Sequence, residues 1–351
     1  MGGGSWTHER YSARVKASAA AGKSTFDYSD RVRRGEEQTL HALLDPTKEA
    51  GPTSPFAGKV MREVCVTPEH PDPTAMLLWL DVTGSNYTAA KTVHSRLPDL
   101  QNYLKNGNFC NDPQINVSAI GDAYSDRFPL QFGQYESDNR LDDQISVIVL
   151  ERGGGGQVRE TYELGAYMAA RHVNLEPFHK YGKKGFVFFL GDEMPYSAVE
   201  QQYGRHTLTS LTGDSIAKSI ATKDLFDELQ QQNHVFFLFQ EQGAYEARKI
   251  VPAWERLIGK DNIVRLKDPQ HVVEVIAAVV ARVEKDMTDG DIEAAMIAAG
   301  GLSHTIKSAI RAVERVKAGI SAKAQQANIG ELTQNAKSVA VTAQGLGGIK
   351  I

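Results

Sequence analysis

From residue 76 onwards, short apolar runs alternate with stretches whose apolar residues recur at helical spacing. The runs are continuous, as expected for strands that are buried on both faces of a sheet. They lie at 76–80, 115–120, 186–190, 235–239 and 263–266. The helical patterns lie at 89–104, 162–171, 223–231, 245–258 and 271–283. This alternation predicts an α/β fold with a doubly wound, mostly parallel sheet, to which residues 130–137 add an antiparallel edge strand.

Outside this region the pattern changes, and the chain divides into four parts. Residues 1–58 are rich in Gly, Ser, Ala and charge without a sustained period, so we expect an irregular N-terminal arm. Residues 59–287 form the predicted α/β domain. Residues 288–320 form a C-terminal helical extension, and residues 321–351, rich in Ala, Gln and Gly, form a weakly ordered tail.

The helical extension carries an apolar stripe. Ile306, Ile310, Val313 and Ile320 recur at helical spacing, with charged residues between them. One amphipathic helix that packs on the domain accounts for this pattern. The same helix could instead protrude as an interaction surface, and the sequence leaves both interpretations open.

The composition is that of an ordinary globular protein, with 41% apolar and 23% charged residues. No apolar run approaches the roughly 20 residues that a membrane-spanning helix needs. The first residues lack a secretory signal pattern. The two cysteines, Cys65 and Cys110, make no disulfide framework and no zinc ligand set. We therefore expect a cytoplasmic protein without a membrane partner.

Charge is distributed unevenly along the chain. The net charge is −4, but residues 304–351 carry seven basic and two acidic side chains, and residues 51–303 carry a net −10. An acidic domain disfavours binding to the phosphates of nucleic acids and favours binding to cations.

Oxygen-bearing side chains gather where the predicted strands end. Asp81-Val82-Thr83-Gly84-Ser85 follows the first apolar run, and Gly191-Asp192-Glu193 follows the third. A glycine-rich loop, 153–157, precedes Glu160, Thr161 and the next helical pattern. Ligands of doubly wound sheets bind beyond the carboxyl ends of the strands, so these loops are expected to converge. Hydroxyl and carboxylate oxygens are the ligands that Mg²⁺ prefers.

These motifs resemble the metal-ion-dependent adhesion site of von Willebrand factor A domains, whose first loop reads Asp-x-Ser-x-Ser. The resemblance covers about residues 60–285 and is closest to intracellular bacterial or phage members with Asp-x-Thr-Gly-Ser and a poly-Gly loop. It implies Mg²⁺ (or Mn²⁺) held by Asp81, Thr83 and Ser85, by a Thr of the second loop, and by Asp192 largely through water. An acidic side chain of a partner protein then completes the coordination.

The chain departs from the family pattern at three points. Thr83 replaces the first Ser, which keeps the hydroxyl. The second-loop Thr does not stand where a short Gly-Gly-Thr pattern would place it. Thr161 is the expected ligand, with Gln157 and Glu160 as alternatives. The distal loop reads Gly191-Asp192-Glu193 in place of the family's common Thr-Asp-Gly. Glu193 could fill the coordination position meant for the partner's carboxylate. Asp122, after the second strand, is a further candidate, for a residue that contacts the ligands without binding the cation itself.

The resemblance implies a Mg²⁺-dependent protein–protein interaction module, not an enzyme. Its partner would offer an Asp or Glu side chain and could belong to a multiprotein assembly with an AAA+ ATPase, as for intracellular members of the family. A structural assembly protein with a vestigial metal site is one alternative. Asp81 could also merely cap the helix that follows it, with Thr83 and Ser85 satisfying the turn.

An enzyme is the remaining alternative. Asp81-x-Thr83-Gly84 is also similar to the haloacid dehalogenase phosphotransferases, in which Asp81 would be the nucleophile and Asp192 would hold Mg²⁺. Val82 stands where the ion-pump branch has Lys, and residues 194–197 lack the expected second acid.

Overall fold

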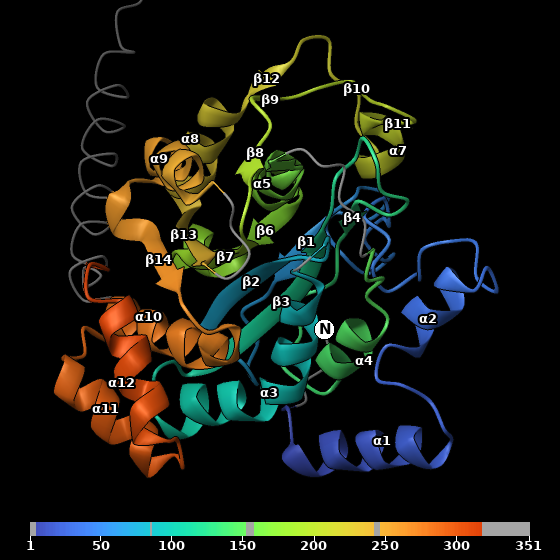
Figure 1. The fold of residues 1–351 in the computed structure, drawn as a ribbon. Coiled ribbons are helices and arrows are strands. Elements are labelled where there is room, and N and C mark those ends of the chain that lie inside the picture. Colours follow the sequence, from blue (N-terminus) through green and yellow to red (C-terminus); the bar gives the residue numbers. More distant parts are fainter. Residues whose placement is uncertain (1–4, 85, 152–157, 242–245, 318–351) are drawn as a thin grey trace, which may run out of the picture.

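A six-stranded sheet with the order β14-β13-β7-β2-β3-β4 forms the centre of the molecule in this computed structural model, which describes residues 5–84, 86–151, 158–241 and 246–317 (Figure 1). The first five strands of this order run parallel, and β4 pairs antiparallel with β3 at one edge. The strands are β2 Pro73–Asp81, β3 Asp112–Ile120, β4 Leu130–Gln131, β7 Gly185–Gly191, β13 Asn233–Gln240 and β14 Ile263–Leu266. The α/β fold with a doubly wound, mostly parallel sheet is confirmed, including the antiparallel edge strand.

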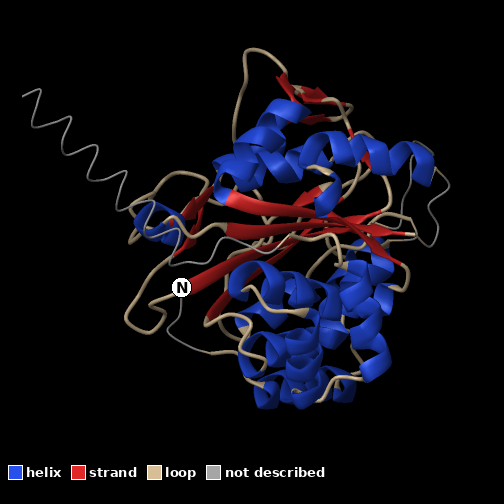
Figure 2. Cartoon of the chain, turned by 90° about the vertical axis from the view of Figure 1, so that its left-hand side faces the viewer, coloured by secondary structure: helices blue, strands red, loops and turns tan. Residues whose placement is uncertain are grey.

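Helices cover both faces of this sheet (Figure 2). The helices on one face are α3 Tyr87–Asn106, α4 Arg140–Ser146 and α10 Val272–Lys285. Those on the other face are α5 Tyr162–Arg171, α8 Thr222–Gln232 and α9 Ala247–Ile258. Alternate residues of β2 belong to the two cores: Leu78 and Leu80 to the first, Leu77 and Trp79 to the second. Two-sided burial therefore explains the uninterrupted apolar run of this strand.

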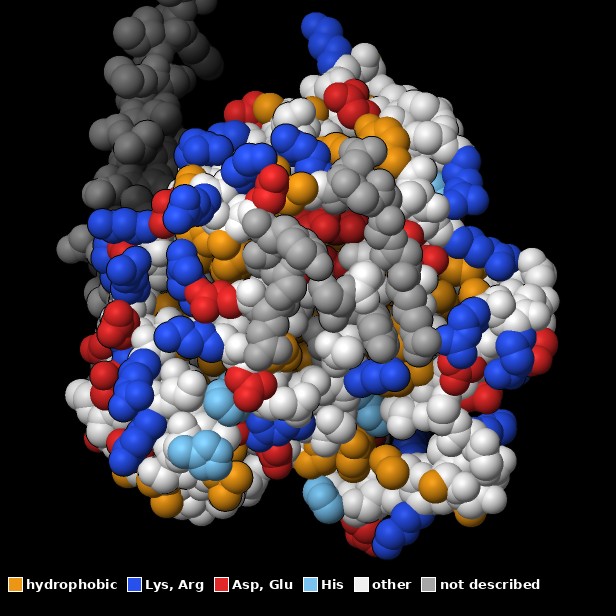
Figure 3. Space-filling view, in the orientation of Figure 1, with side chains coloured by type: hydrophobic (Ala, Val, Ile, Leu, Met, Phe, Trp, Pro, Cys, Tyr) orange, Lys and Arg blue, Asp and Glu red, His pale blue; other side chains and the backbone are white. Residues whose placement is uncertain are grey.

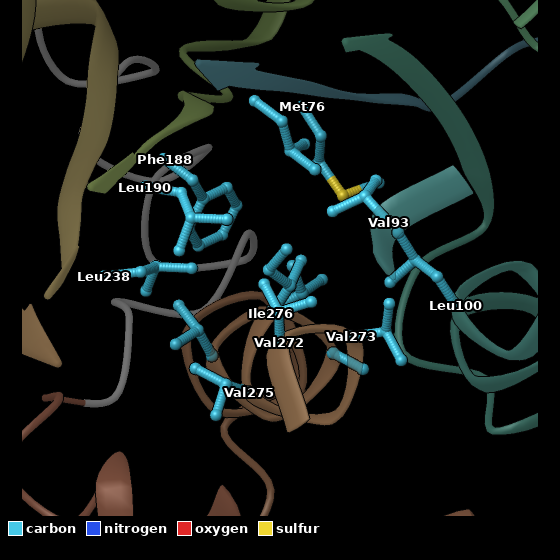
Figure 4. Packing of buried hydrophobic residues seen from close by; sticks show 14 of the residues in the cluster. Met76, Val93, Leu100, Phe188, Leu190, Leu238, Val272, Val273, Val275 and Ile276 are labelled. Atoms are coloured by element: carbon cyan, nitrogen blue, oxygen red, sulfur yellow. The ribbon is translucent and has the colours of Figure 1, made fainter. Parts of the chain in front are cut away.

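Helix α10 is the main apolar cover of its face (Figure 4). Val272 and Ile276 lie among Phe188 and Leu238 of the sheet and Val93 of α3, and all five side chains are buried. The outer side of α10 is covered in turn by α12, so the helix is apolar almost all round.

The N-terminal 58 residues, expected to be irregular, contain two helices, α1 His8–Ala20 and α2 Asp27–Arg33. Helix α1 buries none of its residues, and so it has no apolar stripe that a periodicity could reveal. Its start is fixed by Thr7, whose hydroxyl accepts from the amide of Arg10. Trp6 anchors the segment on the domain, because its indole Nε1 donates to Asp142 Oδ1 at 2.8 Å.

The C-terminal extension forms two helices where one was expected, α11 Asp289–Ala298 and α12 Ser303–Ala312. Gly300 separates them with φ +89°, a conformation that ends a helix and that L side chains rarely adopt. Ile306, Ile310 and Val313 are buried against the domain, so the described part of the stripe packs instead of protruding. Ile320 and the predicted tail, 321–351, lie outside the described residues.

Short elements that the sequence pattern did not reveal surround the sheet. They are β1 Arg62–Val64, β5 Arg159–Glu160, β6 Val173–Leu175, α6 Glu176–Tyr181, β8 Met194–Pro195, β9 Ala198–Val199, β10 Gln202–Tyr203, β11 His206–Thr207, α7 Leu208–Thr212, β12 Ile220–Ala221, η1 Lys260–Asn262 and η2 Pro269–His271. The parallel pair β5–β8 joins the segment before α5 to the segment after β7. Glu160 is thereby held beside the segment that follows Asp192 and Glu193, whereas the glycine-rich residues 153–157 lie outside the described residues. Within the described ranges, no helix has both the length and the apolar character to cross a membrane.

Candidate functional site

Asp81 is the last residue of β2 and is completely buried. Its Oδ1 accepts from the backbone amide of Thr83 at 2.9 Å and from the Thr83 hydroxyl at 2.6 Å. Its Oδ2 accepts from the hydroxyl of Tyr162 at 2.7 Å and from Nδ2 of Asn86 at 3.1 Å. Four donors thus hold this carboxylate at the carboxyl edge of the sheet.

Asp192 lies at the same edge, directly after β7. Strands β2 and β7 are neighbours and pair in register up to Leu80 and Leu190, so the residues that follow them emerge together. Nδ2 of Asn86 donates to Oδ1 of Asp192 as well as to Asp81. The two aspartates expected to share a site are therefore joined through one amide group.

Asn86 is itself held from a third strand. Gln240 ends β13, and its Nε2 donates to Oδ1 of Asn86 at 2.6 Å. Asn86 and Gln240 are both buried. Sequence reasoning missed both residues, although Gln240 follows the rule of polar side chains at carboxyl strand ends, and Asn86 directly follows the Asp-x-Thr-x-Ser motif.

Tyr162, also missed, is fitted closely against Gly191. A Cβ on Gly191 would lie 1.9 Å from the Tyr162 hydroxyl oxygen and 3.1 Å from Asp81 Oδ2, so only glycine leaves room for this hydrogen bond. The Tyr162 ring packs edge-on against Trp254 of α9. Nε1 of Trp254 donates to the carbonyl of Glu193 at 2.8 Å and so fixes the loop after β7.

Thr161, the predicted second-loop ligand, is buried at the start of α5. Its hydroxyl and its amide both donate to the carbonyl of Gly121, which follows β3. The Thr161 side chain is therefore engaged with backbone in this conformation. Ser85 and Gln157, two other sequence candidates, lie outside the described residues.

Further carboxylates surround Asp81 and Asp192. Within the described chain, Glu160 Oε2 and Glu193 Oε2 are buried atoms without a hydrogen-bond partner. Asp122 is also buried and accepts from the Tyr196 hydroxyl at 3.0 Å. Figure 3 shows acidic side chains near the middle of its view.

Burial and, to a smaller extent, the charges of neighbouring acids disfavour the charged forms of these carboxylates. Burial, with a smaller contribution from the Asp192 charge, raises the pKa of Asp81 to about 7. Burial and then the charge of Asp81 raise the pKa of Glu160 to about 11, and burial and the same charge raise that of Glu193 to about 8. The principal charges acting on these three groups belong to other carboxylates. A bound cation would stabilise the ionised forms of all of them.

The donor set at this edge fits a hard divalent cation. Asp81 and Asp192 supply carboxylates, and Thr83 keeps lone pairs on a hydroxyl whose proton is directed to Asp81. Glu160 adds a buried oxygen without a partner among the described residues. In the described part of the chain, no group of three or more His, Cys, Asp or Glu side chains is arranged to hold a metal ion. A cation here would thus depend on hydroxyl and water ligands beside the two aspartates.

No protein-family model and no curated protein matches the chain. Among solved structures it is similar to the pilus adhesin SpaC from Lactobacillus rhamnosus GG in its open conformation, with 12% identity, a TM-score of 0.43, and 60% of this chain and 30% of the adhesin covered. It is also similar to proximal thread matrix protein 1 from the mussel byssus, with 12% identity, a TM-score of 0.39, and 60% and 46% covered. The form of that protein with a zinc-occupied MIDAS motif gives 10% identity, a TM-score of 0.34, and 60% and 48% covered. The match spans less than half of each of these chains.

Proposed function

We propose that the chain is a von Willebrand factor A-like module that binds a divalent cation, Mg²⁺ or Mn²⁺, at the carboxyl edge of its sheet and through it an acidic side chain of a partner protein. The ligands would be Asp81, Thr83, Ser85 and Asp192. The observation that carries the proposal is the amide of Asn86, which contacts Asp81 and Asp192 together. Two carboxylates within reach of one donor group are also within reach of one cation.

Electrostatics supports a cation at this position. Asp81 is completely buried and Asp192 nearly so, and two buried like charges destabilise each other unless a positive charge lies between them. Two carboxylates formally neutralise a divalent cation, but the ion stays a Lewis acid, so an open coordination position can still take a further carboxylate oxygen. The chain's own residues would hold and orient the cation, and the partner would supply the last ligand.

The second-loop ligand stays open among Thr161, Gln157 and Glu160, of which Thr161 and Glu160 lie within the described residues. As a ligand, Thr161 would have to give up its hydrogen bond to the Gly121 carbonyl. Glu160 offers an oxygen that has no partner among the described residues. Glu193, which carries another such oxygen, could occupy the partner's position in the isolated chain.

The partner is proposed from the resemblance alone. A protein with an exposed Asp or Glu suits the open position, and an intracellular assembly with an AAA+ ATPase is the class that the resemblance favours. The module would bind and not catalyse.

The chain departs from the phosphotransferases at two points. Val82 stands where the ion-pump branch has Lys, and residues 194–197 lack the expected second acid. In addition, both oxygens of Asp81 accept hydrogen bonds, so a nucleophilic attack would first require one of these four donors to leave.

Calorimetric titration with MgCl₂ and with MnCl₂ tests the proposal. We expect saturable binding to the wild type and its loss in Asp81→Ala, with an unchanged circular dichroism spectrum. Asp227→Ala, which removes an exposed carboxylate paired with Lys223, is the matched control and should bind like the wild type. Equal binding by the wild type and Asp81→Ala would remove the proposal.

A further inference from the structure

Hydrogen bonds fill the acceptor capacity of Asp81. An ionised carboxylate has about four lone-pair positions, two on each oxygen. Thr83 occupies both positions on Oδ1 through its amide and hydroxyl, and Tyr162 and Asn86 occupy those on Oδ2. A cation that binds Asp81 directly must therefore displace one of these donors.

The donors of Thr83 and Tyr162 are poorly placed to leave. The amide and hydroxyl of Thr83 belong to the turn that directly follows β2, two residues from Asp81. The Tyr162 hydroxyl is enclosed between Asp81 and the backbone of Gly191, and its ring packs on Trp254 and Phe237. Displacing either donor would disturb the backbone or the aromatic core.

The amide of Asn86 is different, because it is a side-chain group that lies between both carboxylates. Its Nδ2 donates to Asp81 Oδ2 and to Asp192 Oδ1 at once. An NH₂ group is the positive end of an amide dipole, so it partly offsets two negative charges as a cation would. Gln240 fixes this orientation, since its Nε2 donates to Asn86 Oδ1.

We propose that Asn86 closes the cation position in the metal-free protein and competes with the cation for Asp81 and Asp192. This inference rests on the proposed function and adds a regulatory residue to the same site. Cation binding requires the amide to turn away from the two carboxylates, and Gln240 resists that turn. The affinity for the cation is thus set below what the two aspartates alone would give.

Two opposite effects follow for Asn86→Ala. Without the cation, Asp81 and Asp192 lose a shared donor and repel each other with less compensation, so the metal-free protein is destabilised. With the cation, no amide has to be displaced, so binding is tighter by about tenfold, the equivalent of one hydrogen bond to a charged group. Gln240→Leu should act in the same direction with a smaller gain, because Asn86 remains but turns more freely.

Thermal unfolding in EDTA and in saturating MgCl₂, together with Mg²⁺ calorimetry, tests the inference. Asn86→Ala should unfold at a lower temperature than the wild type in EDTA, show a larger rise on adding Mg²⁺, and bind Mg²⁺ about tenfold more tightly. Asn233→Ala is the matched control. Asn233 is a buried asparagine at the opposite end of β13, where its Nδ2 donates to the Leu229 carbonyl, so its loss should lower stability but leave the Mg²⁺ response unchanged.

The outcomes separate the two proposals. Wild-type binding with equal or weaker binding by Asn86→Ala overturns the role of Asn86 and leaves the cation site standing. Binding by Asn86→Ala alone supports the closing role in its strongest form. Failure of both proteins to bind Mg²⁺ overturns the role of Asn86 together with the proposed function.

Discussion

Nε1 of Trp254 donates to the carbonyl oxygen of Glu193 at 2.8 Å, which ties helix α9 to the loop that carries Asp192. The same indole stacks on Phe237 of β13 at a centroid distance of 4.0 Å and packs against Tyr162. One side chain therefore connects the aromatic core, the donor to Asp81 and the distal loop. The geometry of the candidate site depends on this helix as well as on the strand ends.

Trp254→Phe should weaken the site more than its loss of stability alone suggests. Phenylalanine keeps much of the ring packing but leaves the Glu193 carbonyl without its donor, at a cost of about 1–2 kcal/mol in the free energy of unfolding. We expect the Mg²⁺ affinity to fall severalfold as the loop loosens, measured by calorimetry.

Trp6→Phe is the matched control for this substitution. Trp6 lies in the N-terminal segment and also donates through its indole Nε1, but to Asp142 of α4. It should lose comparable stability without a change in Mg²⁺ affinity. If both variants lose affinity equally, the effect of Trp254 on the site is one of general stability.

Gly191→Ala should be strongly destabilising, and the main cause should be a clash with the Tyr162 side chain. The new methyl group would lie 1.9 Å from the Tyr162 hydroxyl oxygen, so we expect a loss of about 2–4 kcal/mol in urea unfolding. Combining Gly191→Ala with Tyr162→Phe removes the clashing oxygen and should recover part of that loss.

Non-additivity is the decisive feature of this double-mutant cycle. Gly51→Ala is the control, because nothing lies within 4 Å of the position of its Cβ, and it should be close to neutral. Additive losses for Gly191→Ala and Tyr162→Phe would show that the Tyr162 hydroxyl does not determine the requirement for glycine.

His94 should make stability depend on pH in the acidic range. Burial lowers the pKa of His94 from 6.5 to about 4, and its ring lies among those of Tyr11 and Phe26. A base with a lowered folded-state pKa contributes stability that is full above 6.5 and is lost as the pH falls from 6.5 towards 4. Between pH 7.5 and pH 5 the wild type should lose about 2 kcal/mol through this residue.

His94→Phe isolates this contribution, because the other titrating groups are common to both proteins. The difference in unfolding free energy between variant and wild type, measured by urea unfolding at the two pH values, should shift by about 2 kcal/mol in favour of the variant at pH 5. A difference that stays constant with pH would contradict the assignment.

The strands and the main helices were predictable because two-sided burial leaves a direct trace in the sequence. Leu77 to Leu80 alternate between two cores, and a continuous apolar run is the only pattern that satisfies both. The juxtaposition of Asp81 and Asp192 also followed from sequence, since both residues lie at carboxyl ends of strands that became neighbours in the sheet.

Other features leave no such trace. Helix α1 buries none of its residues, so its sequence lacks the stripe by which helices are recognised. The contacts of Asn86 and Tyr162 depend on side-chain directions and on the space beside Gly191, which neither spacing nor composition encodes. The split between α11 and α12 is marked by Gly300, but the apolar stripe that predicted a helix, Ile306 to Ile320, lies entirely after that glycine and so could not indicate α11 as a separate helix.

The central claim is that Asp81 and Asp192 hold one divalent cation between them. Its most direct test is a crystal of the protein grown or soaked with MnCl₂ and measured for the anomalous signal of manganese. The account predicts an anomalous peak in contact with Asp81 Oδ2 and close to Asp192, with the amide of Asn86 turned away. A manganese-saturated crystal with no peak at this position, and with Asn86 still bonded to both aspartates, would contradict it.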